Sequence, residues 1–292
     1  MAKILVVGLN PAWQKVLSLP SFQSGGVNRA QESWSLASGK GINAAKVLAR
    51  LGHEVSLLQI LAGENGRRCL KDCESWKIRS LHVWTQGETR ECITLLSEDG
   101  PATEIIEPFS VTESDVAQQL LLQIKNDSVY NAVVVCGTIP PGIPESLYAD
   151  ILNIVPASLV VWDSVMGLTP ELLKRISWIK VNAEEFAKLP ALGSSQFSVL
   201  ITDGPNGARV LHSNSANGQY LLPHLNGIRN PIGAGDTVTA ALTDGILCGL
   251  NTETSVKRAL AFGSASCLSP LPAKFNPADI AALESQIRKD VS

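Results

Sequence analysis

The clearest candidate for chemistry in this sequence is the segment Asn230-Pro231-Ile232-Gly233-Ala234-Gly235-Asp236-Thr237. It sets two glycines and a carboxylate directly before an apolar periodic segment that runs from Val238 to about Leu250. Glycines allow tight turns, and the N–H groups at the start of a helix point toward negative charge, so the segment is suited to binding an anion. The carboxylate of Asp236 would repel a phosphate bound at this helix N-terminus, so its presence needs a reason. A role as the general base that takes the proton of an attacking hydroxyl would be one. A simple helix cap is the alternative role for Asp236.

A second glycine-bearing segment, Ser38-Gly39-Lys40-Gly41-Ile42-Asn43-Ala44-Ala45, also precedes a predicted helix. It is not a Walker A loop, because Trp34 and Gly41 occupy the places where that loop needs a glycine and a Ser or Thr. A flexible turn, a cation and a helix N-terminus together suit a phosphate or a hydroxyl-rich ligand. A solvated surface lysine is the alternative role for Lys40.

Composition narrows the class of ligand. The chain has 292 residues and 45% hydrophobic content, which is enough for one large domain. Its net charge is −3 and it has no long basic run, which argues against binding to nucleic acid or a membrane surface. The apolar run after Met1 stops at Gly8, too short for a signal peptide or a membrane span, so we expect a cytoplasmic protein that binds small molecules. Six cysteines without a C-x-x-C pair and four scattered histidines favour reduced, mostly buried thiols over zinc or disulfides.

Short apolar runs alternate with helical patterns along the chain, which predicts an α/β layered domain whose parallel sheet is covered on both faces. Predicted strands are Ile4–Val7, Val55–Ile60, Ala132–Cys136, Leu159–Trp162, Trp178–Val181 and Ser198–Thr202, with an antiparallel addition at Ala208–His212 and Gln219–Leu222. Predicted helices include Gly41–Leu51, about Ser255–Leu268 and about Pro277–Val291. Asp163 closes a predicted strand, and we interpret it as a helix or turn cap outside the site.

Two stretches interrupt this alternation. Residues about 11–37 and about 84–108 are polar and strand-like, and the second is a predicted hairpin with Glu98-Asp99-Gly100-Pro101 at its turn. Strands inserted between sheet elements can pair into a small separate sheet. We expect such a sheet to serve as a lid or a dimer surface, because alone it buries little.

Five segments stand in order along nearly the whole chain: Gly39–Asn43, Cys136–Gly142, Lys180–Glu185, Thr202–Gly207 and Gly233–Thr237. In this order they resemble the motifs of the ribokinase-like carbohydrate kinases, the PfkB family. The resemblance implies a ribokinase-like three-layer α/β/α sandwich over residues 1–292, with a mostly parallel central sheet and a small β-sheet lid. It also implies ATP and Mg²⁺ as the nucleotide and the metal.

Within that family, Asn10-Pro11, Val27-Asn28-Arg29 and Lys40 are similar to the branch that phosphorylates sugar phosphates, the 1-phosphofructokinases and tagatose-6-phosphate kinases. A phosphate carried by the acceptor needs opposite charge. Lys40 and Arg90 supply it, and Arg can hold a phosphate by two parallel hydrogen bonds. The resemblance therefore implies ATP-dependent phosphorylation of a sugar phosphate hydroxyl.

The chain departs from the family pattern at two positions. Gln14 stands where the family's Asn-Pro-x-x-Asp motif has a carboxylate that binds acceptor hydroxyls. Gln donates and accepts hydrogen bonds but lacks the charge that makes such bonds strong. Ser38 replaces the first glycine of the usual G-G-K-G, which narrows the pocket or adds one hydroxyl contact.

The resemblance assigns a role to each matching position. Asp236 is the expected general base, with the N–H groups of Gly233, Ala234 and Gly235 facing the γ-phosphate. The expected acceptor-binding residues are Gln14, Gly39, Lys40, Asn43, Arg90 and Thr138. The expected nucleotide-binding residues are Lys180, Asn182, Thr202, Gly204 and Gly207. Asn182 and Glu185 are expected to order magnesium through water, and the alternatives are a helix cap and a solvated carboxylate.

Two other classes of function stay open at this point. A kinase for a neutral sugar or nucleoside keeps Asp236 but has no need of Lys40. A sensor that binds a sugar phosphate keeps Lys40 and Arg90 but tolerates loss of the base. A dehydrogenase is disfavoured, because no G-x-G-x-x-G follows the first strand. The unpaired edges of the expected lid, and the resemblance, favour a homodimer formed through it.

Overall fold

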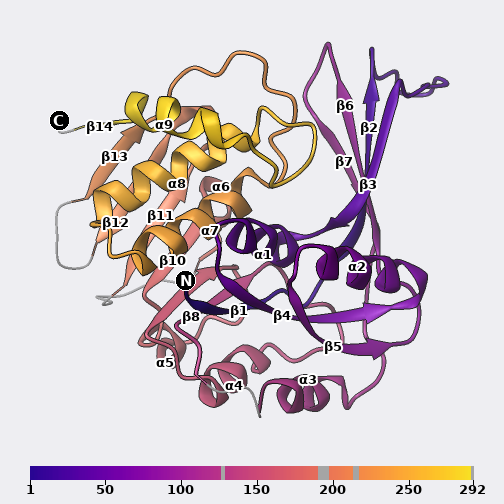
Figure 1. The fold of residues 1–292 in the computed structure, drawn as a ribbon. Coiled ribbons are helices and arrows are strands. Elements are labelled where there is room, and N and C mark those ends of the chain that lie inside the picture. The colour runs from indigo at the N-terminus through magenta and orange to yellow at the C-terminus, as the bar shows by residue number, and fades with distance from the viewer. Residues whose placement is uncertain (126–128, 190–196, 213–216, 291–292) are drawn as a thin grey trace.

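The computed structural model describes residues 1–125, 129–189, 197–212 and 217–290. Its centre is a ten-stranded sheet with the strand order β14-β13-β12-β11-β10-β9-β8-β1-β4-β5 (Figure 1). The strands from β11 to β5 in this order run parallel, and β12, β13 and β14 are added antiparallel, as predicted for the first two. The strands are β1 (Lys3–Val7), β4 (Glu54–Ala62), β5 (Arg79–Thr85), β8 (Ala132–Cys136), β9 (Leu159–Asp163), β10 (Trp178–Asn182), β11 (Ser198–Thr202), β12 (Ala208–His212), β13 (Gly218–Leu221) and β14 (Arg288–Asp290).

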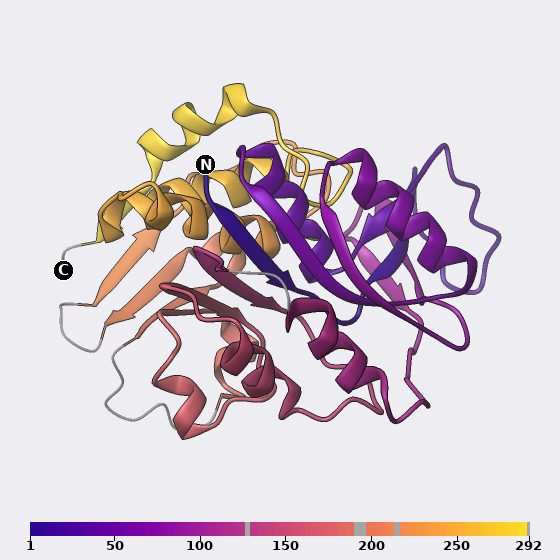
Figure 2. The same ribbon diagram turned by 60° about the horizontal axis from the view of Figure 1, so that its bottom comes forward.

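Side chains of the large sheet alternate between two apolar cores, one on each face. Ile4 and Val6 of β1 belong to one core, and Leu5 and Val7 belong to the other. One face packs against α1 (Lys40–Arg50), α2 (Gly63–Ser75), α7 (Ala234–Leu247), α8 (Thr252–Ser266) and α9 (Pro277–Gln286), and the other against α3 (Val116–Lys125), α4 (Leu147–Ile154), α5 (Pro170–Leu173) and α6 (Ala183–Phe186). The predicted three-layer arrangement is confirmed (Figure 2). Within the described ranges, every helix is too short or too polar to span a bilayer.

Four further strands form a second sheet, which we call the lid: β2 (Ala12–Leu19), β3 (Glu32–Ser38), β6 (Glu91–Ser97) and β7 (Thr103–Ile106). Their order is β3-β2-β6-β7, and they stand to one side of the large sheet (Figure 1). The stretches predicted at about 11–37 and 84–108 supply all four strands, although residues 84 and 85 belong to β5. The predicted hairpin turn at 98–101 joins β6 to β7, and β2 pairs with β6 in parallel.

The C-terminal helix is shorter than predicted. Helix α9 ends at Gln286, and Arg288–Asp290 forms strand β14 along the edge of β13, so the prediction of a helix to about Val291 is wrong. Residue 291 itself lies outside the described residues. Ile287 between the two elements has an extended backbone (φ −74°, ψ 121°) and is only 3% exposed. Burial of this side chain and pairing with an open strand edge outweigh the local helix propensity.

The sequence pattern does not predict β5. Only Leu81 and Val83 of its seven residues are buried, because β5 is the last strand at its end of the sheet. A half-exposed edge strand lacks the continuous apolar run that marks the strands in the middle of a parallel sheet.

Candidate active site

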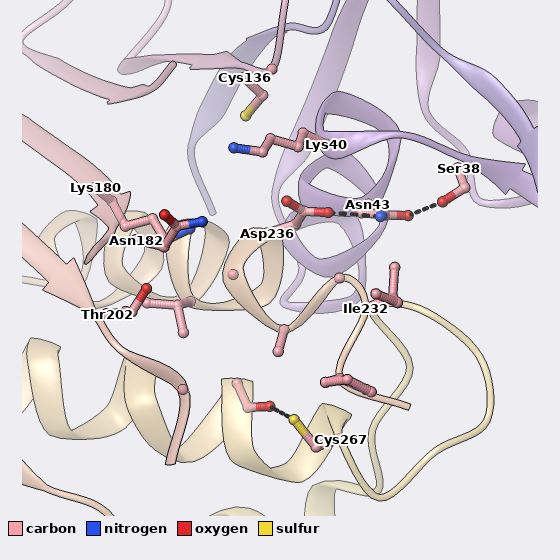
Figure 3. A pocket seen from close by; sticks show the side chains of 18 of the residues that line it. Ser38, Lys40, Asn43, Cys136, Lys180, Asn182, Thr202, Ile232, Asp236 and Cys267 are labelled. Atoms are coloured by element: carbon pink, nitrogen blue, oxygen red, sulfur yellow. Dashed lines mark hydrogen bonds between the residues drawn. The ribbon is translucent and has the colours of Figure 1, made fainter. Parts of the chain in front are cut away.

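The polar residues selected from the sequence surround one cavity of about 860 Å³, a size typical of small-molecule sites. The carboxyl ends of β8, β10 and β11, the N-termini of α1 and α7, and one face of the lid supply its walls. Every residue predicted for the site lines this cavity: Gln14, Gly39, Lys40, Asn43, Arg90, Thr138, Lys180, Asn182, Glu185, Thr202, Gly204, Gly207, Gly233, Ala234, Gly235 and Asp236. Figure 3 shows a part of the wall, with Lys40, Asn43, Lys180, Asn182 and Asp236 facing the same space.

Helix α7 begins at a turn that requires its glycines. Gly233, the residue before the helix, has a left-handed backbone (φ 80°) that glycine adopts without strain. A β-carbon at Gly235 would lie 2.6 Å from Nζ of Lys180, a buried cation beneath the turn. The Ala234 amide donates to the Pro231 carbonyl at 3.2 Å, so this N–H is engaged in the turn, contrary to the prediction that it faces a phosphate. The amides of Gly233 and Gly235 make no hydrogen bond within the described part of the chain.

Asp236 lies in the first turn of α7 and is 7% exposed. Its Oδ2 accepts a hydrogen bond from Nδ2 of Asn43 in α1 at 2.7 Å, and Oδ1 of Asn43 accepts one from the Ser38 hydroxyl at 3.1 Å (Figure 3). The N-cap residue is Gly233, without a side-chain bond, so Asp236 does not cap the helix. Ser38 therefore orients Asn43, and Asn43 orients the carboxylate.

Lys40 and Asp163 form the centre of a charged cluster. Nζ of Lys40 donates to Oδ1 of Asp163 at 2.9 Å and to Oε1 of Glu185 at 2.7 Å. Oδ2 of the fully buried Asp163 accepts from the Thr239 hydroxyl at 2.5 Å and lies 3.3 Å from Nζ of Lys180. The interpretation of Asp163 as a cap is thus wrong, and so is that of Lys40 as a solvated surface residue.

The cluster shifts the affinity of its members for protons. Burial alone lowers the pKa of Lys40, but the carboxylates of Asp163, Asp236 and Glu185 outweigh it and raise that pKa. Burial raises the pKa of Asp163, yet Lys180 and Lys40 outweigh it and lower the pKa to about 2. For Asp236, burial and the neighbouring charge of Asp163 raise the pKa above its usual range. One carboxylate is thus held firmly ionised, and the other accepts a proton more readily.

Asn182 and Glu185 lie at the end of β10 and the start of α6. Oδ1 of Asn182 accepts from the Glu185 amide at 2.8 Å, and Oε2 of Glu185 accepts from the Asn182 amide at 2.9 Å, a capping box. The Glu185 side chain is 21% exposed. The parts of the chain that the structure describes contain no group of three or more His, Cys, Asp and Glu able to hold a metal. This donor set fits magnesium bound by one carboxylate, water and substrate phosphates, which is the coordination that Mg²⁺ usually takes.

The predicted nucleotide residues form a different part of the cavity wall. Thr202 ends β11, and Gly204 begins the short 3₁₀ helix η1 (Gly204–Asn206). Gly207 has φ 103°, and a β-carbon there would lie 2.2 Å from the Tyr220 carbonyl oxygen, so only glycine fits. Lys180 is buried against Asp163 under α7.

The predicted acceptor residues line the cavity beneath the lid. The Gln14 amide donates to the Thr94 hydroxyl at 2.7 Å, and both side chains are buried. The Arg90 guanidinium donates to the carbonyls of Asn10 at 3.1 Å and Pro11 at 3.3 Å, which fixes its position. The Thr138 hydroxyl accepts a hydrogen bond from the side-chain Nδ2 of Asn10 at 3.0 Å. Arg90 and Lys40, far apart in sequence, thus border the same cavity.

Sequence reasoning missed several residues of this site. Asp163 ends β9 at the same sheet edge as Asn182 and Thr202, and that shared position was the available signal, since ligands bind at the carboxyl ends of parallel strands. Asp163 is fully buried and contacts Lys40 and Lys180, whereas the apolar residues Leu222, Leu225 and Ile228 and the lid residue Glu104 line the cavity itself. Their sequence neighbourhoods contain no motif, so only the fold brings them there.

Comparison with known proteins agrees with the geometry. Residues 1–279 match the model of the pfkB family carbohydrate kinases. A tagatose-6-phosphate kinase from Staphylococcus epidermidis is 28% identical over 285 residues, covering 89% of this chain and 90% of that protein. Phosphofructokinase-2 from Escherichia coli superposes with a TM-score of 0.84 at 21% identity, covering 98% of this chain and 99% of that chain. A ribokinase from Thermotoga maritima gives a TM-score of 0.73 at 15% identity, covering 98% of this chain and 100% of that chain.

These structural likenesses confirm the ribokinase-like fold, with a large, mostly parallel sheet and a second, smaller sheet. The match to the family spans the five motifs that suggested the resemblance. Carbohydrate kinases are phosphotransferases with an alcohol group as acceptor. The chain belongs to the PfkB family of carbohydrate kinases.

Proposed function

We propose that the protein transfers the γ-phosphoryl group of ATP to a hydroxyl of a sugar phosphate of the fructose 1-phosphate or tagatose 6-phosphate kind. The observation that carries this proposal is the Asp236 carboxylate at the start of α7, in one cavity with Lys40 and Arg90. A base and two cations suit an acceptor that has both a reacting hydroxyl and a phosphate. The name of the tagatose-6-phosphate kinase relative supports the same class of acceptor.

Asp236 acts as the general base in this mechanism. It accepts the proton of the attacking hydroxyl while that oxygen bonds to phosphorus and the bond from phosphorus to the ADP oxygen breaks. Asn43 holds one carboxylate oxygen and leaves the other, which has no hydrogen bond in the described residues, for the proton. Burial raises the pKa of Asp236, which makes it a better proton acceptor near neutral pH. The free amides of Gly233 and Gly235 stabilise charge on the transferring group.

Arg90 and Lys40 bind the phosphate of the acceptor. Two backbone carbonyls fix the Arg90 guanidinium, which has five N–H groups, so others remain for a phosphate. Lys40 uses two of its three N–H groups on Asp163 and Glu185 and keeps the third. A neutral sugar has no need of these two cations.

Thr202, Gly204 and Gly207 frame the nucleotide. Lys180 lines the same cavity beneath the amides of α7 and adds positive charge for the phosphates of the nucleotide. Glu185 and Asn182 would hold magnesium through water, and the ion would supply positive charge against the phosphates of the nucleotide.

Coupled ADP-release assays test this proposal. The acceptors are fructose 1-phosphate, fructose 6-phosphate, tagatose 6-phosphate, ribose and adenosine, and we expect a sugar phosphate to give the highest kcat/KM. Asp236→Asn should lower kcat by about 10²–10⁴-fold with little change in the KM for ATP. Full turnover by this variant would remove the assignment of the base. Preference for ribose or adenosine would favour the neutral-acceptor class, and tight sugar-phosphate binding without turnover would favour a sensor.

We also propose a homodimer formed through the lid. Its edge strands are β3 and β7, and β7 exposes 52% of Ile105. Val27 and Phe22, between β2 and β3, are 80% and 44% exposed. Open strand edges beside exposed apolar side chains favour pairing with a second copy.

A further inference from the structure

The lid carries a carboxylate that the mechanism above does not use. Glu104 of β7 lines the cavity beneath the lid, together with Gln14 of β2 and Arg90. Side chains alternate along β7, so Glu104 and Ile106 line the cavity while Ile105 lies on the other side of the strand. The strand register therefore directs this carboxylate toward the substrate side of the lid.

Glu104 differs from the other polar side chains around it in having no partner. No hydrogen bond or ion pair joins its carboxylate to the residues that the structure describes. Its neighbour Thr94, opposite it on β6, is fully buried and accepts the Gln14 amide at 2.7 Å. The neutral Gln14 is thus held by the lid itself, whereas the charged Glu104 is free to bind a ligand.

The charges facing Glu104 place it at the acceptor end of the cavity. Glu104 is an exposed residue, but desolvation by the surrounding protein and the negative charge of Asp236 raise its pKa, and the nearby Arg90 opposes that rise. The carboxylate thus lies within electrostatic reach of both the proposed base and the proposed phosphate-binding cation. Arg90, Asp236 and Glu104 line the same cavity, so a ligand bound there shares the cavity with this carboxylate.

We propose that Glu104 accepts hydrogen bonds from hydroxyl groups of the acceptor sugar and helps to select that sugar. The inference rests on the proposed function. An ionised carboxylate forms charge-assisted hydrogen bonds with hydroxyls, which the amide of Gln14 cannot match. Glu104 binds hydroxyls that do not react, while Asp236 takes the proton of the one that does. The preferred acceptor therefore has free hydroxyls in addition to its phosphate and its reacting hydroxyl.

The test compares Glu104→Gln and Glu104→Asp with a matched control, Glu98→Gln, which changes an exposed carboxylate at the β6–β7 turn outside the cavity. Steady-state assays measure the KM for the preferred sugar phosphate, the KM for ATP and inhibition by inorganic phosphate. Losing a hydrogen bond to a charged group should raise the sugar-phosphate KM by about 10- to 100-fold in Glu104→Gln. The KM for ATP should stay near wild type, Glu104→Asp should be intermediate, and Glu98→Gln should match wild type.

Inorganic phosphate separates hydroxyl binding from a general effect of charge. Because it reports on Arg90 and Lys40 but has no sugar hydroxyls, its inhibition constant should be unchanged or lower in Glu104→Gln. The midpoint of thermal unfolding should equal that of wild type, since the carboxylate has no partner in the described residues to lose.

Three results would overturn the inference. The first is an unchanged or lower sugar-phosphate KM in Glu104→Gln. The second is an equal rise in the sugar-phosphate KM and the phosphate inhibition constant, which would assign the effect to Arg90. If wild type turns over no sugar phosphate, the proposed function fails by itself. Calorimetric titration of wild type and Glu104→Gln with fructose 1-phosphate then tests the role of Glu104. The third overturning result is that the two proteins bind fructose 1-phosphate equally well or that neither binds it.

Discussion

Asp163→Asn tests the buried charge cluster that holds the site together. Asp163 is fully buried and receives Lys40 on one oxygen and Lys180 and Thr239 on the other. An asparagine has one acceptor oxygen and turns an N–H₂ donor toward one of the two lysines. Removing one partner of a buried ion pair costs about 3–5 kcal/mol, because a charge is left uncompensated.

The pKa of Asp163 gives a second, independent magnitude. Its fall from 3.8 to about 2 corresponds to about 2 kcal/mol of stability at neutral pH. The folded-state pKa is depressed, so this stabilisation is complete above the unfolded value of 3.8 and is lost as pH falls through about 2. At pH 3, between the two pKa values, roughly half of it, about 1 kcal/mol, remains.

Urea unfolding at pH 7 and pH 3 measures both quantities. We expect Asp163→Asn to be less stable than wild type by about 3 kcal/mol at pH 7, with the difference smaller by about 1 kcal/mol at pH 3. Asp150→Asn, which changes an exposed aspartate in α4, should match wild type at both pH values. A difference that is zero at pH 7, or that does not shrink at pH 3, would show that Asp163 is not held ionised by the two lysines.

Other substitutions test single contacts of the site. Gly235→Ala places a methyl group 2.6 Å from Nζ of the buried Lys180, and it should lower the free energy of thermal unfolding by about 1–3 kcal/mol. The control Gly100→Ala adds a methyl group in open space and should leave stability unchanged. Equal stabilities of the two variants would contradict the packing argument. Asn43→Ala removes the hydrogen bond that favours the ionised form of Asp236, so the pKa of Asp236 should rise. The acid limb of the pH profile of kcat/KM should then move to higher pH. An unmoved limb would exclude Asp236 as the titrating base. Ile105→Lys should convert a dimer to monomers in sedimentation equilibrium, and a dimer that persists would place the interface elsewhere.

Local signals were sufficient to predict the elements that hold the site. The glycines at 233 and 235 mark the start of α7, because Gly233 takes a left-handed turn without strain and Gly235 leaves room for Nζ of Lys180. The apolar run Ala132–Cys136 marks a strand buried on both faces. These features depend on residues adjacent in sequence, so the sequence displays them directly.

Features that depend on distant residues were not predictable in the same way. Asp163 resembles a strand-end cap until β9, α1 and β10 bring two lysines to it from positions 40 and 180. Strand β14 exists because β13 offers an open edge and Ile287 is buried, neither of which the local sequence records. The free N–H of Ala234 was assumed from the motif, but the turn engages it with Pro231.

The charged residues of the site give its carboxylates different roles, in keeping with their different exposure. Three cations stand against four carboxylates around the cavity: Lys40, Lys180 and Arg90 against Asp163, Glu185, Asp236 and Glu104. The negative charges outnumber the positive ones by one, so these side chains supply no surplus of positive charge for the phosphates of two substrates. In the proposed mechanism, the amides of α7 and magnesium would supply that positive charge. In the proposed mechanism, the partly exposed Glu185 would exchange its contact with Lys40 for the ion. Asp163 is fully buried between two lysines, so it fixes the lysines in position.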